Sequence, residues 1–151
     1  MKKLLSIILI FTTLFAYAQT PGENINVTHY EIHLNNFDFT NHTLQAQTVV
    51  TLTALNAVNS FELELKSLNV TSVTSNDANV SSFAQSGDIL SINLASALAA
   101  NASASFTITY GGNTFNEDWG GVMWSGNYVC NMGVGFESIP HNLGKCWFPC
   151  V

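Results

Sequence analysis

The chain has 151 residues, of which 47% are hydrophobic and only 9% are charged, so one compact domain is expected and a disordered tail or two ordinary domains are excluded. The net charge is −6, and the four basic residues are all lysines, two of them at positions 2 and 3. Because phosphate neutralisation needs clustered Lys or Arg, we expect no nucleic-acid partner, and electrostatic attachment to anionic lipid is excluded for the same reason.

The first 18 residues have the three parts of a secretory signal peptide. Lys2 and Lys3 form a positive start, residues 4–15 are almost all apolar, and Ala16-Tyr17-Ala18 provides a small-x-small cleavage site. The polar residues 19–22 interrupt the apolar run before the roughly 20 residues that a membrane-spanning helix needs. The sequence therefore predicts a signal peptide over 1–18, a domain over 19–151, a secreted or periplasmic location, and no membrane anchor after cleavage.

From Val27 onward, apolar and polar residues alternate with a period of two, which is typical of half-buried β-strands. In the first run, Tyr30, Ile32 and Leu34 share one face. Further runs of short strands, separated by Asn, Asp, Ser and Gly, cover residues 44–54, 61–66, 68–74, 80–83, 89–94 and 106–110. Only residues 95–104 indicate a helix, and weakly. The pattern predicts an all-β fold with antiparallel sheets packed as a β-sandwich or an open barrel.

Two histidines, His29 and His33, have the spacing of a helical zinc-protease motif, but they lie on a predicted strand. Residues four apart on a strand are separated by about 13 Å, which is too far for both imidazoles to bind one metal ion without a sharp bend. We therefore expect both side chains to face solvent.

Three cysteines, Cys130, Cys146 and Cys150, leave at least one thiol without an intramolecular disulfide partner. Extended geometry before Pro149 separates Cys146 from Cys150, so Cys130 would be the shared partner of any disulfide. A zinc site made from these cysteines and His141 would need a fourth ligand. Buried, unreactive cysteine is the favoured interpretation.

The segment after Gly112 is rich in glycine and aromatic residues. Four of its aromatic residues are Phe115, Trp119, Trp124 and Tyr128. Their side chains could stack on sugar rings or fill the core, and we favour the core because burying an aromatic ring removes a large area from water.

Gly133-Val134-Gly135 lacks the third glycine and the helix of a dinucleotide-binding loop. No catalytic triad or marked pair of carboxylates is evident in the sequence.

Three segments, taken in order, carry a resemblance to a known family: residues 29–34 (HYEIHL), 106–112 (FTITYGG) and 148–151 (FPCV). They resemble the N-terminal β domain of the aminopeptidase N family of zinc metallopeptidases (gluzincins). There an opening strand Y-x-I-x-L leads to a strand ending Y-x-G, and the domain closes with F-P-C-F-D-x-P. Val151 stands where that family has an aromatic residue.

The resemblance implies a saddle-like open β-sheet that packs on a thermolysin-like catalytic domain. In the family that domain holds the zinc ion with H-E-x-x-H and a downstream Glu, and binds the substrate amine with G-x-M-E-N. None of these motifs occurs in the 151 residues. The chain is therefore expected to be the leading part of a secreted aminopeptidase, incomplete at its C-terminus, with no catalytic residue, no metal ligand and no cofactor of its own.

One residue is connected to substrate by the resemblance. Family members provide a Glu or Gln, shortly before F-P-C, to the pocket for the free α-amine of the peptide substrate, and Glu137 is the closest match. The peptide substrate would bind through the catalytic domain, which these residues lack. The alternative function is a stand-alone secreted β-sandwich module that binds glycan or protein.

Overall fold

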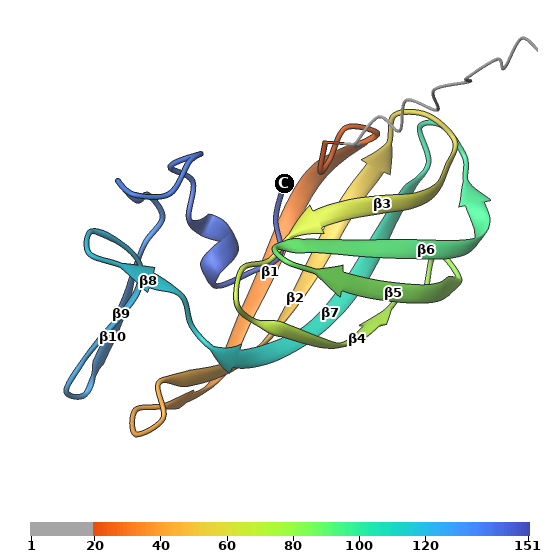
Figure 1. Cartoon of the computed structure of the whole chain (residues 1–151). Helices are drawn as coiled ribbons and strands as arrows, with labels where there is room; N and C mark the ends of the chain where they lie inside the picture. The colour runs from red at the N-terminus through yellow and green to blue at the C-terminus, as the bar shows by residue number, and fades with distance from the viewer. Residues whose placement is uncertain (1–19) are drawn as a thin grey trace, which may run out of the picture.

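A computed structural model describes residues 20–151 of the chain. This part contains ten β-strands and one short 3-10 helix (Figure 1). Within residues 20–151, no helix has the length and hydrophobicity needed to cross a membrane. The predicted signal peptide and the predicted start of the domain at residue 19 lie outside the described residues.

Two antiparallel sheets build the main body of the domain. The first sheet has four strands in the order β1 (Ile25–Asp38), β2 (Thr43–Ala54), β7 (Ser103–Asn113) and β4 (Asn69–Thr74). The second has three strands in the order β3 (Val58–Glu64), β6 (Ile89–Leu98) and β5 (Val80–Ser86), and it lies across the first (Figure 1). The prediction of an all-β fold with open antiparallel sheets is confirmed.

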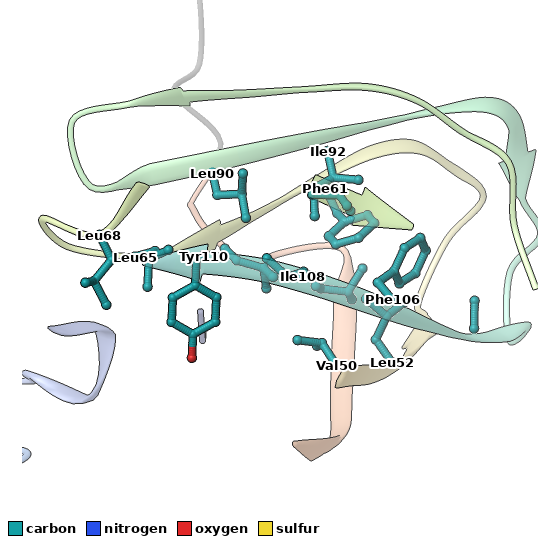
Figure 2. Close-up of a cluster of buried hydrophobic side chains, with 14 of the residues drawn as sticks. Val50, Leu52, Phe61, Leu65, Leu68, Leu90, Ile92, Phe106, Ile108 and Tyr110 are labelled. Carbon is teal, nitrogen blue, oxygen red and sulfur yellow. The ribbon is translucent and has the colours of Figure 1, made fainter. Parts of the chain in front are cut away.

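The core lies between these two sheets and is built from the alternating residues that the sequence placed on one face. Figure 2 shows buried side chains of both sheets turned toward each other. Phe61 of β3 meets Phe106 of β7 edge to face, with their ring centroids 4.8 Å apart. Such pairs add to the stabilisation from burial alone.

The outer face of the first sheet is polar, as a half-buried strand pattern requires. Hydroxyl groups pair across β2 and β7, where Thr51 and Thr53 form hydrogen bonds with Ser105 (3.0 Å) and Ser103 (2.8 Å). His29 and His33 are exposed on β1, which confirms that they face solvent.

The helix indicated over residues 95–104 is wrong. Strand β6 continues to Leu98, a turn follows, and β7 starts at Ser103. The turn contains Asn101 in the left-handed region, at φ 64°, a conformation that Asn tolerates better than most residues. Cross-strand pairing of Val58 with Leu98, together with burial of Ala104, outweighs the helix preference of alanine.

A third, smaller sheet follows and is not anticipated by the periodicity. Its strands have the order β10 (Tyr128–Met132), β9 (Gly120–Ser125) and β8 (Asn116–Glu117), and the 3-10 helix η1 (Gly144–Cys146) lies beyond them in the chain. A separate small core forms here around Val122, Leu143 and Cys146.

The segment from η1 to Cys150 attaches this region to the main body. Cys150 pairs with Glu64 at the end of β3 through two backbone hydrogen bonds of 2.7 and 3.0 Å. The buried Tyr110 hydroxyl donates to the carbonyl of Trp147 at 2.8 Å. The loop before η1 is thereby held at a defined place relative to the sandwich.

Candidate binding loop and its surroundings

The residues between β10 and η1 form a closed loop, 133–143, which contains Glu137. At its base the Gly135 amide donates to the His141 carbonyl (3.0 Å) and the Leu143 amide donates to the Gly133 carbonyl (2.9 Å). Leu143 is fully buried and fixes one end of the loop in the small core. The Glu137 side chain is exposed, so it is free to meet a partner.

Glu117 of β8 binds the far part of this loop through its carboxylate. Oε1 accepts a hydrogen bond from the Glu137 amide (3.0 Å), and Oε2 accepts from the Ser138 amide (3.1 Å) and from the Ser138 hydroxyl (2.5 Å). Glu117 is only 9% exposed. Nothing in the sequence distinguishes Glu117 from its polar neighbours Asn116 and Asp118, so no sequence pattern marks it as a functional residue.

The Ser138 hydroxyl is the main reason why the pKa of Glu117 is lowered. Burial opposes this effect, and the amides of Glu137, Ser138 and Phe136 reinforce it. Each of these groups donates to the ionised form of the carboxylate and so favours it. Glu117 therefore carries its negative charge at neutral pH.

Glycine is required where the loop approaches β8 and β9. A Cβ atom at Gly135 would collide with Glu117 Oε1 and with Leu143 Cδ1, and one at Gly120 would collide with Leu143 Cδ1 and the Val134 carbonyl oxygen. Gly135 thus serves close packing against a carboxylate. This gives a structural role to Gly135 of the segment Gly133-Val134-Gly135, which does not match a dinucleotide-binding loop.

Exposed apolar side chains lie on the loop with Glu137 and at the neighbouring β8–β9 turn. Phe136 is 70% exposed and Ile139 is 91% exposed, and Val134 and Trp119 are exposed as well. We call these four residues the apolar rim. Large exposed apolar side chains that lie together beside a polar side chain such as Glu137 are typical of a surface that another protein domain or a ligand covers.

The prediction that four aromatic residues fill the core is wrong for two of them. Trp119 (67% exposed) lies in the β8–β9 turn, and Tyr128 (81% exposed) begins β10 directly after the β9–β10 turn. Phe115 and Trp124 do pack against the small core. The difference arises because Trp119 lies in a turn and Tyr128 at the end of a short strand, where no second layer covers them.

The only two cations among the described residues, Lys66 and Lys145, belong to one ionic cluster. Lys145 Nζ lies 2.7 Å from Glu64 Oε1 and 3.5 Å from Asp88 Oδ2, and Lys66 Nζ lies 3.6 Å from the same Asp88 oxygen. Burial of Lys145 disfavours its charged form and would lower its pKa. The hydrogen bonds and negative charges of Glu64 and Asp88 outweigh this effect, so the pKa of Lys145 is raised. The cluster links η1 to the second sheet.

All three cysteines are free thiols, so none of the disulfides considered from the sequence is present. Burial raises the pKa of Cys146 to about 11 and that of Cys150 to about 12, whereas Cys130 is exposed. The interpretation as buried, unreactive cysteine fits Cys146 and Cys150 and is wrong for Cys130.

In the part of the chain that the structure describes, no three His, Cys, Asp or Glu residues are grouped to hold a metal ion.

Together, the fold and the site define an all-β domain that presents one carboxylate, Glu137, on an anchored loop beside apolar side chains. The family model described as the Peptidase M1 N-terminal domain matches residues 26–135, and the chain belongs to this family. The resemblance noted from residues 29–34, 106–112 and 148–151 is thereby confirmed.

Solved structures of M1 zinc metallopeptidases share this fold. A mutant of the enzyme from Deinococcus radiodurans bound to a Tyr-Ser-Ala substrate has a TM-score of 0.69 at 19% identity, over 85% of this chain and 29% of that chain. A two-domain M1 zinc metallopeptidase mutant bound to L-tryptophan has a TM-score of 0.71 at 17% identity, over 89% of this chain and 31% of that chain. This chain thus spans about a third of the length of each structure. A search of curated proteins found no match.

Proposed function

We propose that the chain is the N-terminal, non-catalytic domain of a secreted or periplasmic zinc aminopeptidase, an enzyme that removes N-terminal residues from peptides. Family membership supports this proposal. The described residues do not fit a zinc site, because their His, Cys, Asp and Glu side chains form no group of three. In the proposed enzyme, the zinc ion is held by a catalytic domain outside these residues, and we expect this chain alone to be inactive.

Within such an enzyme, Glu137 binds the free α-amine of the peptide substrate. The observation that carries this assignment is the exposed Glu137 carboxylate on an anchored loop beside the apolar rim. When a catalytic domain covers Phe136 and Ile139, water is excluded around the carboxylate. A charge-assisted hydrogen bond to an ammonium group is then stronger than in open solvent.

The kinetics of Glu137→Gln in the full-length enzyme test this role. A hydrogen bond to a charged group contributes about 1.5–3 kcal/mol, so kcat/KM for substrates with a free N-terminus should fall roughly ten- to hundred-fold. Substrates with a blocked N-terminus carry no ammonium and should be hydrolysed as well by the variant as by the parent. Glu23→Gln, a change at an exposed glutamate near the start of β1, is the matched control and should leave both rates unchanged.

Equal losses on free and blocked substrates, or no loss on either, would remove Glu137 from amine recognition. The proposed domain role would survive that result, because it depends on family membership and not on one side chain.

A second candidate function, a stand-alone secreted module that binds glycan or protein, is favoured by the exposed rings of Trp119 and Tyr128. Exposed aromatic side chains can stack on sugar rings. Screening the chain against immobilised oligosaccharides tests this function. Binding that is lost in Trp119→Ala would support it, and no binding to any of them would count against a glycan module.

A further inference from the structure

We propose that Glu117 is a positioning residue that fixes the 133–143 loop and thereby the direction in which Glu137 points. The purpose of this positioning rests on the proposed amine-binding role of Glu137. The positioning itself depends only on contacts within this chain. Three donors of the loop, two amides and one hydroxyl, converge on the single Glu117 carboxylate at 2.5–3.1 Å.

The loop's own backbone does not supply these contacts. Its internal hydrogen bonds lie at the base, between Gly135 and His141 and between Leu143 and Gly133. The amides of Glu137 and Ser138, further along the loop, donate to Glu117 instead. The backbone on both sides of the Glu137 Cα atom is therefore held from β8, 20 residues earlier in the chain.

The contact also requires the ionised form of Glu117. Two of the three loop groups that meet the carboxylate are backbone amides, which can only donate, so a protonated or amidated Glu117 side chain would place a donor against an amide donor. The absence of a side chain at Gly135 lets the loop approach the carboxylate closely. The Cys146 thiol, whose pKa is influenced by the charge of Glu117, has a pKa of about 11 and stays neutral in the acid range.

Hydrogen–deuterium exchange of the 151-residue chain, followed by mass spectrometry, tests the proposal at neutral pH. In Glu117→Gln, the protection of peptides covering 134–143 should fall roughly ten- to hundred-fold, the factor expected for losing a hydrogen bond to a charged group. Asp118→Asn is the matched control, because it removes one charge from the neighbouring exposed residue and should leave the loop protected. Peptides from β2 and β7 report whether the sandwich stays folded.

A pH series adds a measurement that needs no Glu117 variant. The pKa of Glu117 is lowered in the folded state, so the anchoring should be complete above about pH 4.5 and lost as pH falls through the lower folded-state pKa. Ser138→Ala removes the nearest donor and should move this loss to higher pH. Repeating the series with Glu137→Gln removes the second carboxylate of this site from the comparison.

Loop protection that is equal in Glu117→Gln and the parent would overturn the proposal. If Glu117→Gln unfolds the sandwich, the pH series of the parent and of Ser138→Ala becomes the test. The proposal is then overturned if Ser138→Ala leaves the pH dependence of loop protection unchanged. The amine-binding role is separable by kinetics. A loop released in Glu117→Gln, combined with unchanged hydrolysis by Glu137→Gln, would disprove the role of Glu137 and leave the positioning by Glu117 in place.

Discussion

Replacing Lys145 with methionine should destabilise the domain more than replacing Lys66, the other lysine of the same ionic cluster. Lys145 is 8% exposed and is the closest cation to Glu64, at 2.7 Å. Methionine keeps most of the side-chain length, so the change removes charge without opening a large cavity. Glu64 is then left without a cation, and Asp88 keeps only Lys66, at 3.6 Å.

The loss of unfolding free energy expected for Lys145→Met lies between two limits. An exposed ion pair contributes about 0.2–1 kcal/mol, and breaking a fully buried pair costs about 3–5 kcal/mol. The Lys145 side chain is nearly buried, but the Glu64 side chain is 23% exposed and can gain water after the substitution. We therefore expect the free energy of unfolding to fall by about 2–3 kcal/mol, an intermediate value.

Urea unfolding of the parent and of Lys145→Met, with linear extrapolation, measures this difference. Lys66→Met is the matched control and should cost less, about 1 kcal/mol or below, because its ion pair is longer and more exposed. In the double variant with Glu64→Gln, the two losses should be less than additive. A loss below about 0.5 kcal/mol for Lys145→Met, or one equal to that of Lys66→Met, would refute the view that this cluster holds η1 on the second sheet.

Three further predictions concern alkaline stability, the thiols and zinc. Burial raises the pKa of Tyr110 to about 12, as it raises those of Cys146 and Cys150. The unfolded chain therefore loses these protons first, and stability should fall as pH rises above about 9, by up to about 1.4 kcal/mol per pH unit for each group. Thermal melts with equal midpoints at pH 8 and pH 10.5 would contradict this. A thiol reagent should modify Cys130 rapidly in the folded chain and Cys146 and Cys150 only in urea, and rapid reaction of all three thiols would argue against the burial described. The purified chain should bind no zinc stoichiometrically and should not hydrolyse amino-acid arylamides, and elemental analysis with one tightly held zinc ion per chain would disprove this.

The main sandwich could be predicted from the sequence because its signal is local and repeated. In β2, the alternation from Leu44 to Ala54 matches the buried positions of the strand, with more accessible residues between them. In β3, Phe61 and Leu63 are buried, and the glutamates between and after them are more accessible. Such periodicity follows directly from strand geometry, so it needs no knowledge of the partner strands.

The third sheet and the anchor of the loop could not be predicted in this way. Strand β8 has two residues, which is too short for any periodic signal. Glu117 acts on Ser138, 21 residues away, and Lys145 acts on Glu64, 81 residues away. Contacts at such separations depend on the folded arrangement, and the residue types alone do not specify them. The role of Glu137 stays a prediction, because it depends only on the distance of this residue from the F-P-C segment in a resembling family.

The most direct test of the proposed domain role is to read the coding sequence that follows the codon for Val151. We predict an open reading frame that continues into a catalytic domain with G-x-M-E-N, then H-E-x-x-H and a downstream Glu, the residue set that binds zinc and activates water in this type of peptidase. A stop codon directly after Val151 would contradict the role as an aminopeptidase domain and would favour the stand-alone binding module.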